Sequence, residues 1–277
     1  MPEGHTIHRL AAEFRARFAG RGVRVSSPQG KFGAAAALLD RSVLTDADAY
    51  GKHLFLHFGS GPGTRMVRVH LGLFGRLDFA RTPNDDTVRL RINHRARIAD
   101  LRGPTACELL EERASILSRL GPDPLRADAD PDRAFQRIRR SRQPIAALLM
   151  DQKVIAGVGN VYRAEVLFRH RMSPEKSGQS VTRAEWELIW ADLVGLMADG
   201  VRANRIDTVR PEHTPEAMGR PPRVDDHGGE VYVYRRAGLP CHVCGTEIRT
   251  TVLAARNLFW CPGCQGGLSS PPASPAR

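Results

Sequence analysis

The sequence predicts an α+β protein of several domains: an N-terminal β-sandwich with a flanking helix, a helical middle domain, and a C-terminal β-hairpin with four cysteines. Three observations support this prediction. Strand-like runs fill the first part of the chain, a helical period replaces them after about residue 133, and two Cys-x2-Cys pairs stand near the C-terminus. The chain has 277 residues, 42% of them hydrophobic, so it is long enough for two domains with real cores.

The N-terminal domain is expected to cover residues 1–126. It begins with a helix over 6–18, in which apolar residues recur on one face. The runs HLFLHF, RMVRVHLGLFGRLDF, VRLRI and ARIADL follow, and clusters of Gly, Pro, Asn and Asp separate them. This pattern is typical of a compact β-sandwich or barrel. The segment GPDPLRADADPD, rich in Pro and Asp, then predicts a linker.

Helical periodicity and one long loop mark residues 133–225. The segments PIAALLMDQ, NVYRAEVLFRHR and RAEWELIWADLVGLMADGV predict helices, the first with Pro144 at the first helical position. Residues 207–229 lack periodicity and are rich in Pro, His and Gly, which is typical of a functional or disordered loop. The four cysteines lie in the third part, 230–265, and the low-complexity tail 266–277 is predicted to be disordered.

The charge balance indicates a polyanionic partner. Lys and Arg number 41 and Asp and Glu number 30, which gives a net charge of +11 and a pI near 10.2. A basic surface without a partner is the alternative. No apolar run is long enough to cross a membrane and no signal peptide is visible, so we expect a cytoplasmic protein without a membrane partner. No feature indicates oligomerisation, and a monomer is the default.

The cysteines predict one structural zinc ion. Cys241, Cys244, Cys261 and Cys264 form two Cys-x2-Cys pairs separated by sixteen residues, a spacing that suits tetrahedral Zn²⁺. In a reducing compartment this clustering favours a metal over disulfides. Four thiolates leave no position for water, so the ion is not catalytic. The residues between the pairs predict a β-hairpin with Arg256 near its tip, either as a phosphate clamp or as an ordinary surface charge.

The sequence AGVGN predicts a sharp turn between two helices. Gly157 and Gly159 allow the backbone to turn and to approach a ligand closely. Asn160 stands at or next to the N-cap of the second helix, where free amide groups favour a phosphate. The alternative is a plain helical hairpin with a glycine-rich connection.

Three features of the N-terminal domain have both a functional and an ordinary interpretation. Lys52 precedes an apolar strand and is either a rim charge or a reactive amine. Leu73 and Phe74 lie between two glycines, either as core residues or as wedges that enter DNA where a base leaves the stack. Pro2 is either an idle terminal residue or, once Met1 is removed, the one secondary amine in the protein.

Taken together, these motifs resemble the formamidopyrimidine-DNA glycosylase and endonuclease VIII family over nearly the whole chain, to about residue 265. The resemblance rests on PEG at the N-terminus, a lysine after a glycine in the β domain, HLGLFGRL, the helix–two-turn–helix LLMDQKVIAGVGNVYRAEVLF, and RNLFWCPGCQ. It implies a bifunctional DNA glycosylase and abasic-site lyase of base excision repair, with a helix–two-turn–helix domain and a zinc ribbon. Its partner would be damaged DNA, which places it at the nucleoid.

The resemblance also implies roles for individual residues. Pro2 would be the nucleophile that forms a Schiff base with C1′ of the damaged nucleotide, and Glu3 the general acid. Lys52 would assist β-elimination and bind a phosphate, and Arg256 would clamp a phosphate and assist δ-elimination. Asn160 would hold the DNA backbone from the helix–two-turn–helix.

Four further residues are expected to contact DNA. Leu73 and Phe74 are candidates to fill the void that the flipped base leaves, and His70 and Lys153 complete the expected contact surface. The zinc ion would act by positioning the hairpin that presents Arg256.

The sequence departs from the family pattern at two places. His5 and Thr6 stand where many members carry a second acid, and ADLRGPTACEL replaces a DPRRFG-like motif. PEG and RNLFWCPGCQ favour the endonuclease VIII branch and oxidised pyrimidines, while HLGLFG leaves oxidised purines as the alternative. Two other functions are less consistent with the sequence. If the protein were a non-catalytic zinc-dependent DNA-binding protein, Pro2, Glu3 and Lys52 would have no role. If it were a tautomerase-like enzyme, the C-terminal half would have none.

Overall fold

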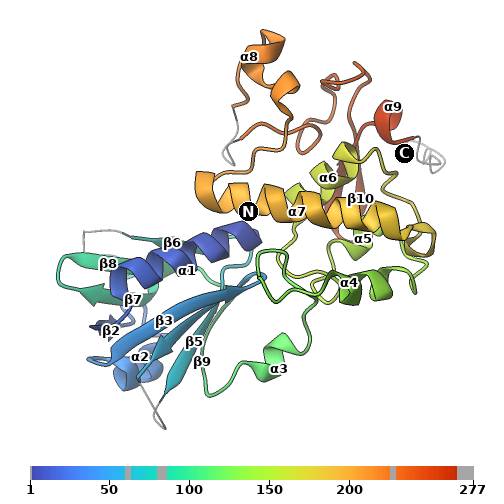
Figure 1. The fold of residues 1–277 in the computed structure, drawn as a ribbon. Helices are drawn as coiled ribbons and strands as arrows, with labels where there is room; N and C mark the ends of the chain where they lie inside the picture. Colours follow the sequence, from blue (N-terminus) through green and yellow to red (C-terminus); the bar gives the residue numbers. More distant parts are fainter. Residues whose placement is uncertain (1, 60–63, 80–85, 225–228, 267–277) are drawn as a thin grey trace, which may run out of the picture. The chain divides into compact units, whose positions relative to one another are not determined.

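Figure 1 shows the computed structural model of the chain, which contains two compact units, residues 1–119 and residues 120–277. Each unit has a hydrophobic core of its own. Among the helices of the described residues, none is long and apolar enough to cross a membrane. The residues that the structure describes are 2–59, 64–79, 86–224 and 229–266.

The first unit contains two antiparallel sheets that enclose one core, which confirms the predicted β-sandwich. The five-stranded sheet has the order β1-β3-β4-β5-β9, and the four-stranded sheet has the order β2-β7-β8-β6. The strands are β1 (Arg21–Gly22), β2 (Arg24–Ser26), β3 (Val43–Tyr50), β4 (His53–Phe58), β5 (Arg65–His70), β6 (Arg76–Asp78), β7 (Val88–His94), β8 (Arg97–Arg102) and β9 (Ala106–Leu110). The helices are α1 (Gly4–Phe18), α2 (Gly33–Leu39) and α3 (Ala114–Leu117).

Helix α1 packs along β3, and its apolar face is buried in the core of the sandwich (Figure 1). Near the end of the helix, the Arg15 guanidinium donates to Oδ1 of Asp46 at 2.7 Å. This bond places the C-terminal end of α1 beside the start of β3. The N-terminus of α1 therefore lies toward the Tyr50 end of that strand.

The run RMVRVHLGLFGRLDF, whose apolar pattern predicted a strand-like stretch, is divided by a turn between β5 and β6. Gly72 has φ of +67°, which favours glycine, and a Cβ there would lie 1.8 Å from Oγ1 of Thr105. A Cβ on Gly75 would lie 2.2 Å from the carbonyl oxygen of Leu71. A side chain at either position would therefore collide with its neighbours, so the turn requires glycine at both. This turn projects Leu73 and Phe74, which lie between the two glycines.

The second unit is helical and ends in a two-stranded hairpin. The long helix α7 begins with a capping box, in which Oγ1 of Thr182 accepts the Glu185 N–H and the Glu185 carboxylate accepts the Thr182 N–H. Pro144 is the N-cap of α5 rather than its first residue, and that helix is short. The helices are α4 (Pro131–Ile138), α5 (Ile145–Leu148), α6 (Asn160–Arg169), α7 (Arg183–Ala203), α8 (Pro215–Met218) and α9 (Pro262–Gln265). The 3-10 turns are η2 (Gly178–Ser180) and η3 (Pro211–His213), and the strands are β10 (Arg249–Leu253) and β11 (Arg256–Trp260).

Residues 121–124, whose composition indicated a linker, are buried in the second unit. The N–H of Gly121 donates to the Gln152 carbonyl at 2.8 Å, and the N–H of Ala156 donates to the Pro122 carbonyl at 3.0 Å. These bonds tie the segment to the turn that precedes α6. Long-range contacts, which Pro and Asp content does not encode, therefore decide its position.

The segment 207–229 is folded where the structure describes it, and it contains η3 and α8. The Glu230 carboxylate anchors it by accepting a hydrogen bond from the Arg220 guanidinium at 2.6 Å. Residues 225–228 and the tail residues 267–277, for which disorder was predicted, lie outside the described residues.

Candidate functional site

The N-terminus of α1 carries the two residues expected to perform the chemistry. Glu3 is the N-cap of the helix and is 0% exposed, and its carbonyl accepts the N–H of Thr6 at 3.0 Å. Pro2 precedes it and is half-buried. Because unpaired amide groups and the helix dipole place partial positive charge at this end, the site favours an approaching anion.

His5 occupies the first turn of α1 and is 5% exposed. Burial, together with the charges of Arg9, the N-terminal amine and His8, lowers the pKa of His5 to about 4. The ring is therefore neutral at pH 7. It supplies no negative charge in place of the second acid that the family pattern would put in this turn.

Lys52 lies in the turn between β3 and β4, at the same end of the five-stranded sheet as the turn that follows β5. The strand register shows this, because His53 at the start of β4 pairs with His70 at the end of β5. The N-terminus of α1 lies toward this end as well. The first unit therefore gathers its predicted site residues at one end of the sheet, although they are far apart in sequence.

His70 holds the turn that follows β5. Its Nδ1 accepts the N–H of Gly72 at 3.1 Å, and its ring centroid lies 4.9 Å from that of His53. Burial and the charges of Arg68 and Lys52 lower the pKa of His70. Burial, Arg68, His70 and Lys52 together lower the pKa of His53 to about 3. Two neutral imidazoles thus support the turn, and one nitrogen of His70 is already used inside the protein.

Leu73 and Phe74 extend from this turn into solvent. Leu73 is 40% exposed and Phe74 is 89% exposed, so neither is a core residue. An aromatic ring left this exposed costs hydrophobic free energy that burial would recover. The structure therefore excludes the ordinary interpretation, core packing, for both residues.

The helix–two-turn–helix ties Asn160 to the hairpin strand β11. Asn160 is the first residue of α6, after the N-cap Gly159, and its Nδ2 donates to the Asn257 carbonyl at 2.9 Å. Arg163 donates to Oδ1 of Asn160 and, at 3.2 Å, to the Asn257 carbonyl. Because Asn257 follows Arg256, these bonds hold the strand that carries Arg256 against α6.

Gln152 closes the turn before α6, although no sequence pattern pointed to it. Its amide nitrogen donates to the carbonyls of Met150 at 3.1 Å and Val158 at 2.9 Å. Its Oε1 accepts the N–H of Gly157 at 3.0 Å. The adjacent Lys153 is exposed, as a DNA contact requires. Gln152 stands between two other polar residues, Asp151 and Lys153, so no sequence signal set it apart.

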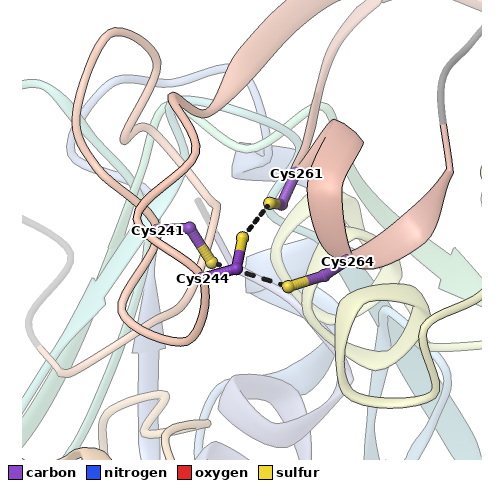
Figure 2. A group of neighbouring side chains, drawn as sticks. All are labelled: Cys241, Cys244, Cys261 and Cys264. Carbon is purple, nitrogen blue, oxygen red and sulfur yellow. Dashed lines mark hydrogen bonds between the residues drawn. The ribbon is translucent and has the colours of Figure 1, made fainter.

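The four cysteines form a metal site of the predicted kind (Figure 2). Their Sγ atoms lie within 4.8 Å of one another, with 3.8 Å between Cys241 and Cys264 and 3.4 Å between Cys244 and Cys261. A tetrahedron with Zn–S bonds of about 2.3 Å has edges of about 3.8 Å, so the four thiolates fit Zn²⁺. The Cys261 N–H donates to Oε1 of Gln265 at 2.9 Å, which fixes one ligand backbone. One structural zinc ion stabilises this end of the chain.

Arg256 stands directly after the tip of the predicted hairpin. Ala254 and Ala255 form the tip with φ of 50° and 57°, and Leu253 pairs with Arg256 across it. The Arg256 side chain makes no hydrogen bond or ion pair with the residues described here. Its guanidinium is therefore available to a phosphate.

Glu165 is a second residue that no sequence pattern identified. Its buried carboxylate accepts hydrogen bonds from Oγ1 of Thr208 at 2.6 Å and from the N–H groups of Tyr232, Val233 and Tyr234 at 2.7, 2.8 and 2.8 Å. These bonds attach the segment that leads to the zinc cysteines to α6. An acid inside a helix buried on all sides was the available signal.

Three family models match the chain. They are the formamidopyrimidine-DNA glycosylase N-terminal domain over residues 1–107, the formamidopyrimidine-DNA glycosylase H2TH domain over residues 120–210, and the zinc finger found in FPG and IleRS over residues 238–266. In chain order, the three matched regions contain the two sheets, the turn with Asn160, and the cysteine hairpin.

Relatives match over most of their length. The chain is 52% identical to Endonuclease 8 1 of Mycobacterium tuberculosis over 96% of this chain and 100% of the relative. It is 33% identical to formamidopyrimidine-DNA glycosylase of Thermus thermophilus, over 83% and 85% of the two chains. The fold is similar to the crystal structure of the MutM (FPG) protein from Thermus thermophilus, with a TM-score of 0.73, 27% identity, and coverage of 96% and 99%.

Proposed function

This chain belongs to the formamidopyrimidine-DNA glycosylase family. From this premise we propose roles for individual residues in excising an oxidised base and in cutting the strand at the abasic site. The protein is a bifunctional DNA glycosylase and abasic-site lyase of base excision repair, and it binds DNA. The position of Pro2 and Glu3 at the N-terminus of α1 is the observation that supports the proposed chemistry.

Pro2 is the nucleophile in this proposal. Removal of Met1 leaves a secondary amine at the positive end of the α1 dipole, which disfavours the protonated amine and leaves the lone pair free. The lone pair attacks C1′ of the damaged nucleotide, and the N-glycosidic bond breaks with its electrons going to the base, which takes up a proton. The amine then loses its remaining proton as the sugar ring opens, and an iminium joins Pro2 to C1′.

Glu3 supplies the proton for ring opening. Its buried carboxyl is adjacent to Pro2, and a proton passed to O4′ allows the C1′–O4′ bond to break. The iminium acidifies C2′–H, and loss of that proton expels the 3′ phosphate. A second elimination expels the 5′ phosphate, and water finally releases Pro2 from the sugar.

Several basic and polar side chains hold the phosphates during these steps. Lys52 and His70 lie at the site end of the first sheet, while Arg256, Asn160 and Lys153 belong to the zinc hairpin and the turn before α6. The side-chain amide of Asn160 has two roles: it contacts the DNA backbone, and its hydrogen bond to β11 helps to position Arg256. Cationic contacts such as those of lysine and arginine supply most of the affinity for DNA and weaken with salt.

Leu73 and Phe74 fill the space that the flipped nucleotide leaves. Their exposure, on a turn between two closely packed glycines, suits insertion into the base stack, which lowers the free energy cost of an extrahelical lesion. The connection between β8 and β9 has three residues, which is short for a loop that inserts a side chain into DNA. We therefore assign the wedge to the turn with Leu73 and Phe74.

Oxidised pyrimidines are the proposed substrates. The 52% identity to Endonuclease 8 1 of Mycobacterium tuberculosis supports this preference. The 33% identity to a formamidopyrimidine-DNA glycosylase keeps oxidised purines as the alternative. We further propose a monomer that acts on nucleoid DNA in the cytoplasm, because one chain carries both the reactive amine and the zinc hairpin.

Trapping with borohydride tests the role of Pro2. Incubation with abasic-site DNA should reduce the iminium to a stable adduct, and peptide mapping should place it on Pro2. A chain with extra N-terminal residues should form no adduct, because its Pro2 nitrogen is an amide. Glu3→Gln should slow ring opening, and therefore strand cleavage at a damaged base, at least a hundredfold, while Glu13→Gln, in the same helix, should not. An adduct on a lysine, or none while DNA stays bound, would contradict the assignment.

Replacement of Arg256 tests the phosphate clamp. Arg256→Ala should retain one zinc per chain, yet bind abasic-site DNA at least tenfold more weakly and nick it more slowly. Arg249→Ala is the matched control, because Arg249 is exposed at the other end of the same hairpin. Equal DNA affinity of the two variants would overturn the role of Arg256.

A further inference from the structure

A cavity at the C-terminal end of α6 has no part in the chemistry proposed above. It belongs to the second unit and has a volume of about 240 Å³. Asn160 stands at the opposite end of this ten-residue helix, about 15 Å away at 1.5 Å per residue. Arg171, Arg210 and His213 line the cavity together with Tyr232, and the zinc ligand Cys264 borders it. The cavity is therefore separate from the phosphate contacts assigned to the start of α6.

Arg171 has a backbone conformation that normally belongs to glycine. The N–H of Arg171 donates to the Phe168 carbonyl and the N–H of Met172 to the Leu167 carbonyl, both at 2.9 Å, which is a Schellman motif. Arg171 is the residue after the helix C-cap in this motif and has φ of +49°. A non-glycine residue there costs about 1 kcal/mol. A strained arginine that lines a cavity is a reason to look for a ligand.

The two cavity arginines at the surface differ from their neighbour Arg169. The Arg169 guanidinium donates to both carboxylate oxygens of Asp192, at 2.7 and 2.8 Å, and to the Thr208 carbonyl, so it is committed to the fold. The guanidinium groups of Arg171 and Arg210 make no hydrogen bond or ion pair within the described ranges of the chain. They leave two planar groups of donors for a ligand.

A tyrosine and a histidine complete the donor set. The Tyr232 hydroxyl accepts the N–H of Arg210 at 2.8 Å and lies 2.9 Å from Nδ1 of His213. Burial raises the pKa of Tyr232, so the hydroxyl keeps its proton and donates it to Nδ1. Because Nδ1 of His213 accepts this bond, Nε2 carries the N–H of the ring. Glu212 adds one carboxylate to the lining; its side chain is 61% exposed, and its Oε1 lies 4.0 Å from Nδ1 of His213.

We propose that this cavity binds a phosphate group through Arg171, Arg210 and His213. Two guanidinium forks and an imidazole N–H match the several oxygens of a phosphate better than the two oxygens of a carboxylate. The volume of about 240 Å³ leaves room for the ester that carries the phosphate, since a water molecule in the liquid takes up about 30 Å³. The phosphate belongs either to a free ion or nucleotide, or to the DNA backbone beyond the lesion.

Titration calorimetry with inorganic phosphate tests the site. The zinc-loaded, full-length protein should bind phosphate at constant ionic strength, and Arg171→Gly and Arg210→Ala should each weaken binding at least tenfold. Arg171→Gly should also raise the Tm in phosphate-free buffer, because glycine relieves the strain, so its loss of binding is not misfolding. Arg202→Ala is the matched control, since Arg202 is exposed in the same unit and pairs with Asp199. Equal phosphate affinity in the wild type and both cavity variants would overturn the proposal.

Affinity for long duplex DNA identifies the source of the phosphate. If the DNA backbone supplies it, each cavity variant should lower the DNA affinity and reduce the slope of log K against log salt by about 1. If a free ion or nucleotide supplies it, DNA affinity should stay unchanged while phosphate binding is lost. Borohydride trapping on Pro2 should be unaffected in either case, so the site and the catalytic assignment fail independently.

Discussion

His53 and His70 show how single residues set the electrostatics of the first unit. Both rings belong to apolar strands, and their centroids lie 4.9 Å apart. Arg68 donates to Nδ1 of His53 at 3.1 Å, so a proton on that ring would face a fixed positive charge. Burial and this arrangement lower the pKa of both rings, with that of His53 falling to about 3. Neutral histidines keep the end of the sheet free of like-charge repulsion beside Lys52.

This pair predicts acid sensitivity of the first unit. The pKa of His53 is about 3 when folded and about 6.5 when unfolded, so its stabilising effect is complete above pH 6.5 and is lost as pH falls toward 3. Between pH 7 and pH 4.5 the loss is about 2.5 kcal/mol. Hydrogen exchange of β4 and β5 should show this loss, and His53→Phe should remove it. A variant with the wild-type pH dependence would contradict the account.

The hairpin tip is strained beside the residue expected to bind phosphate. Ala254 and Ala255 both have positive φ, as in the two-residue turn that usually contains Asn-Gly. Each alanine costs about 1 kcal/mol in this conformation. The zinc site and the bond from Asn160 to Asn257 hold the hairpin closed in spite of this strain. The position of Arg256 therefore depends on contacts outside its own strand.

At the scale of elements, the turn before α6 depends on one side chain. The side chain of Gln152 makes three hydrogen bonds to backbone groups of this turn. Backbone groups between two helices have no partners within either helix, so side chains must satisfy them. The turn carries Lys153 and leads to Asn160. Its shape therefore supports the proposed DNA contacts of Lys153 and Asn160, although Gln152 itself need not touch DNA.

Gln152→Ala should destabilise this turn by about 2 kcal/mol, because buried carbonyls and an N–H lose their partners. Affinity for abasic-site DNA should fall several-fold. Gln179→Ala is the matched control, since Gln179 is exposed in the same unit and, among the residues that the structure describes, bonds only through its backbone N–H. Urea unfolding and fluorescence anisotropy measure the two effects, and equal behaviour of both variants would exclude a positioning role for Gln152.

At the scale of the whole molecule, the two units are stabilised differently. The first has a core made of sheet residues and α1, and the second combines a helical core with zinc thiolates.

Chelation of zinc should therefore abolish DNA binding and strand cleavage, because the metal no longer holds the hairpin in its folded form. Hydrogen exchange should remain slow in β3, β4 and β5. A loss of protection there after chelation would contradict independent cores, and added Zn²⁺ should restore activity.

Much of the candidate site was predictable from sequence because its chemistry is local. The Cys-x2-Cys spacing specified a tetrahedral thiolate site, AGVGN specified a sharp turn before a helix, and Pro2 was a unique terminal amine. The hydrogen-bond partners of Gln152 and Glu165 were not predictable, because they are mostly backbone groups that share no sequence pattern. The burial of residues 121–124 was missed for the same reason, since composition reports flexibility rather than contacts.

The sequence by itself determined the order of the motifs along the chain and the zinc ligands, and it indicated candidates for the reactive groups, because these follow from covalent order, periodicity and ligand chemistry. The tertiary structure alone decided that Lys52 and the Leu73–Phe74 turn share one end of a sheet, and that Asn160 supports the strand of Arg256. It also decided that Leu73 and Phe74 are exposed and that Arg171 lines a cavity. Strand register, burial and side-chain contacts arise from long-range packing, which local sequence does not specify.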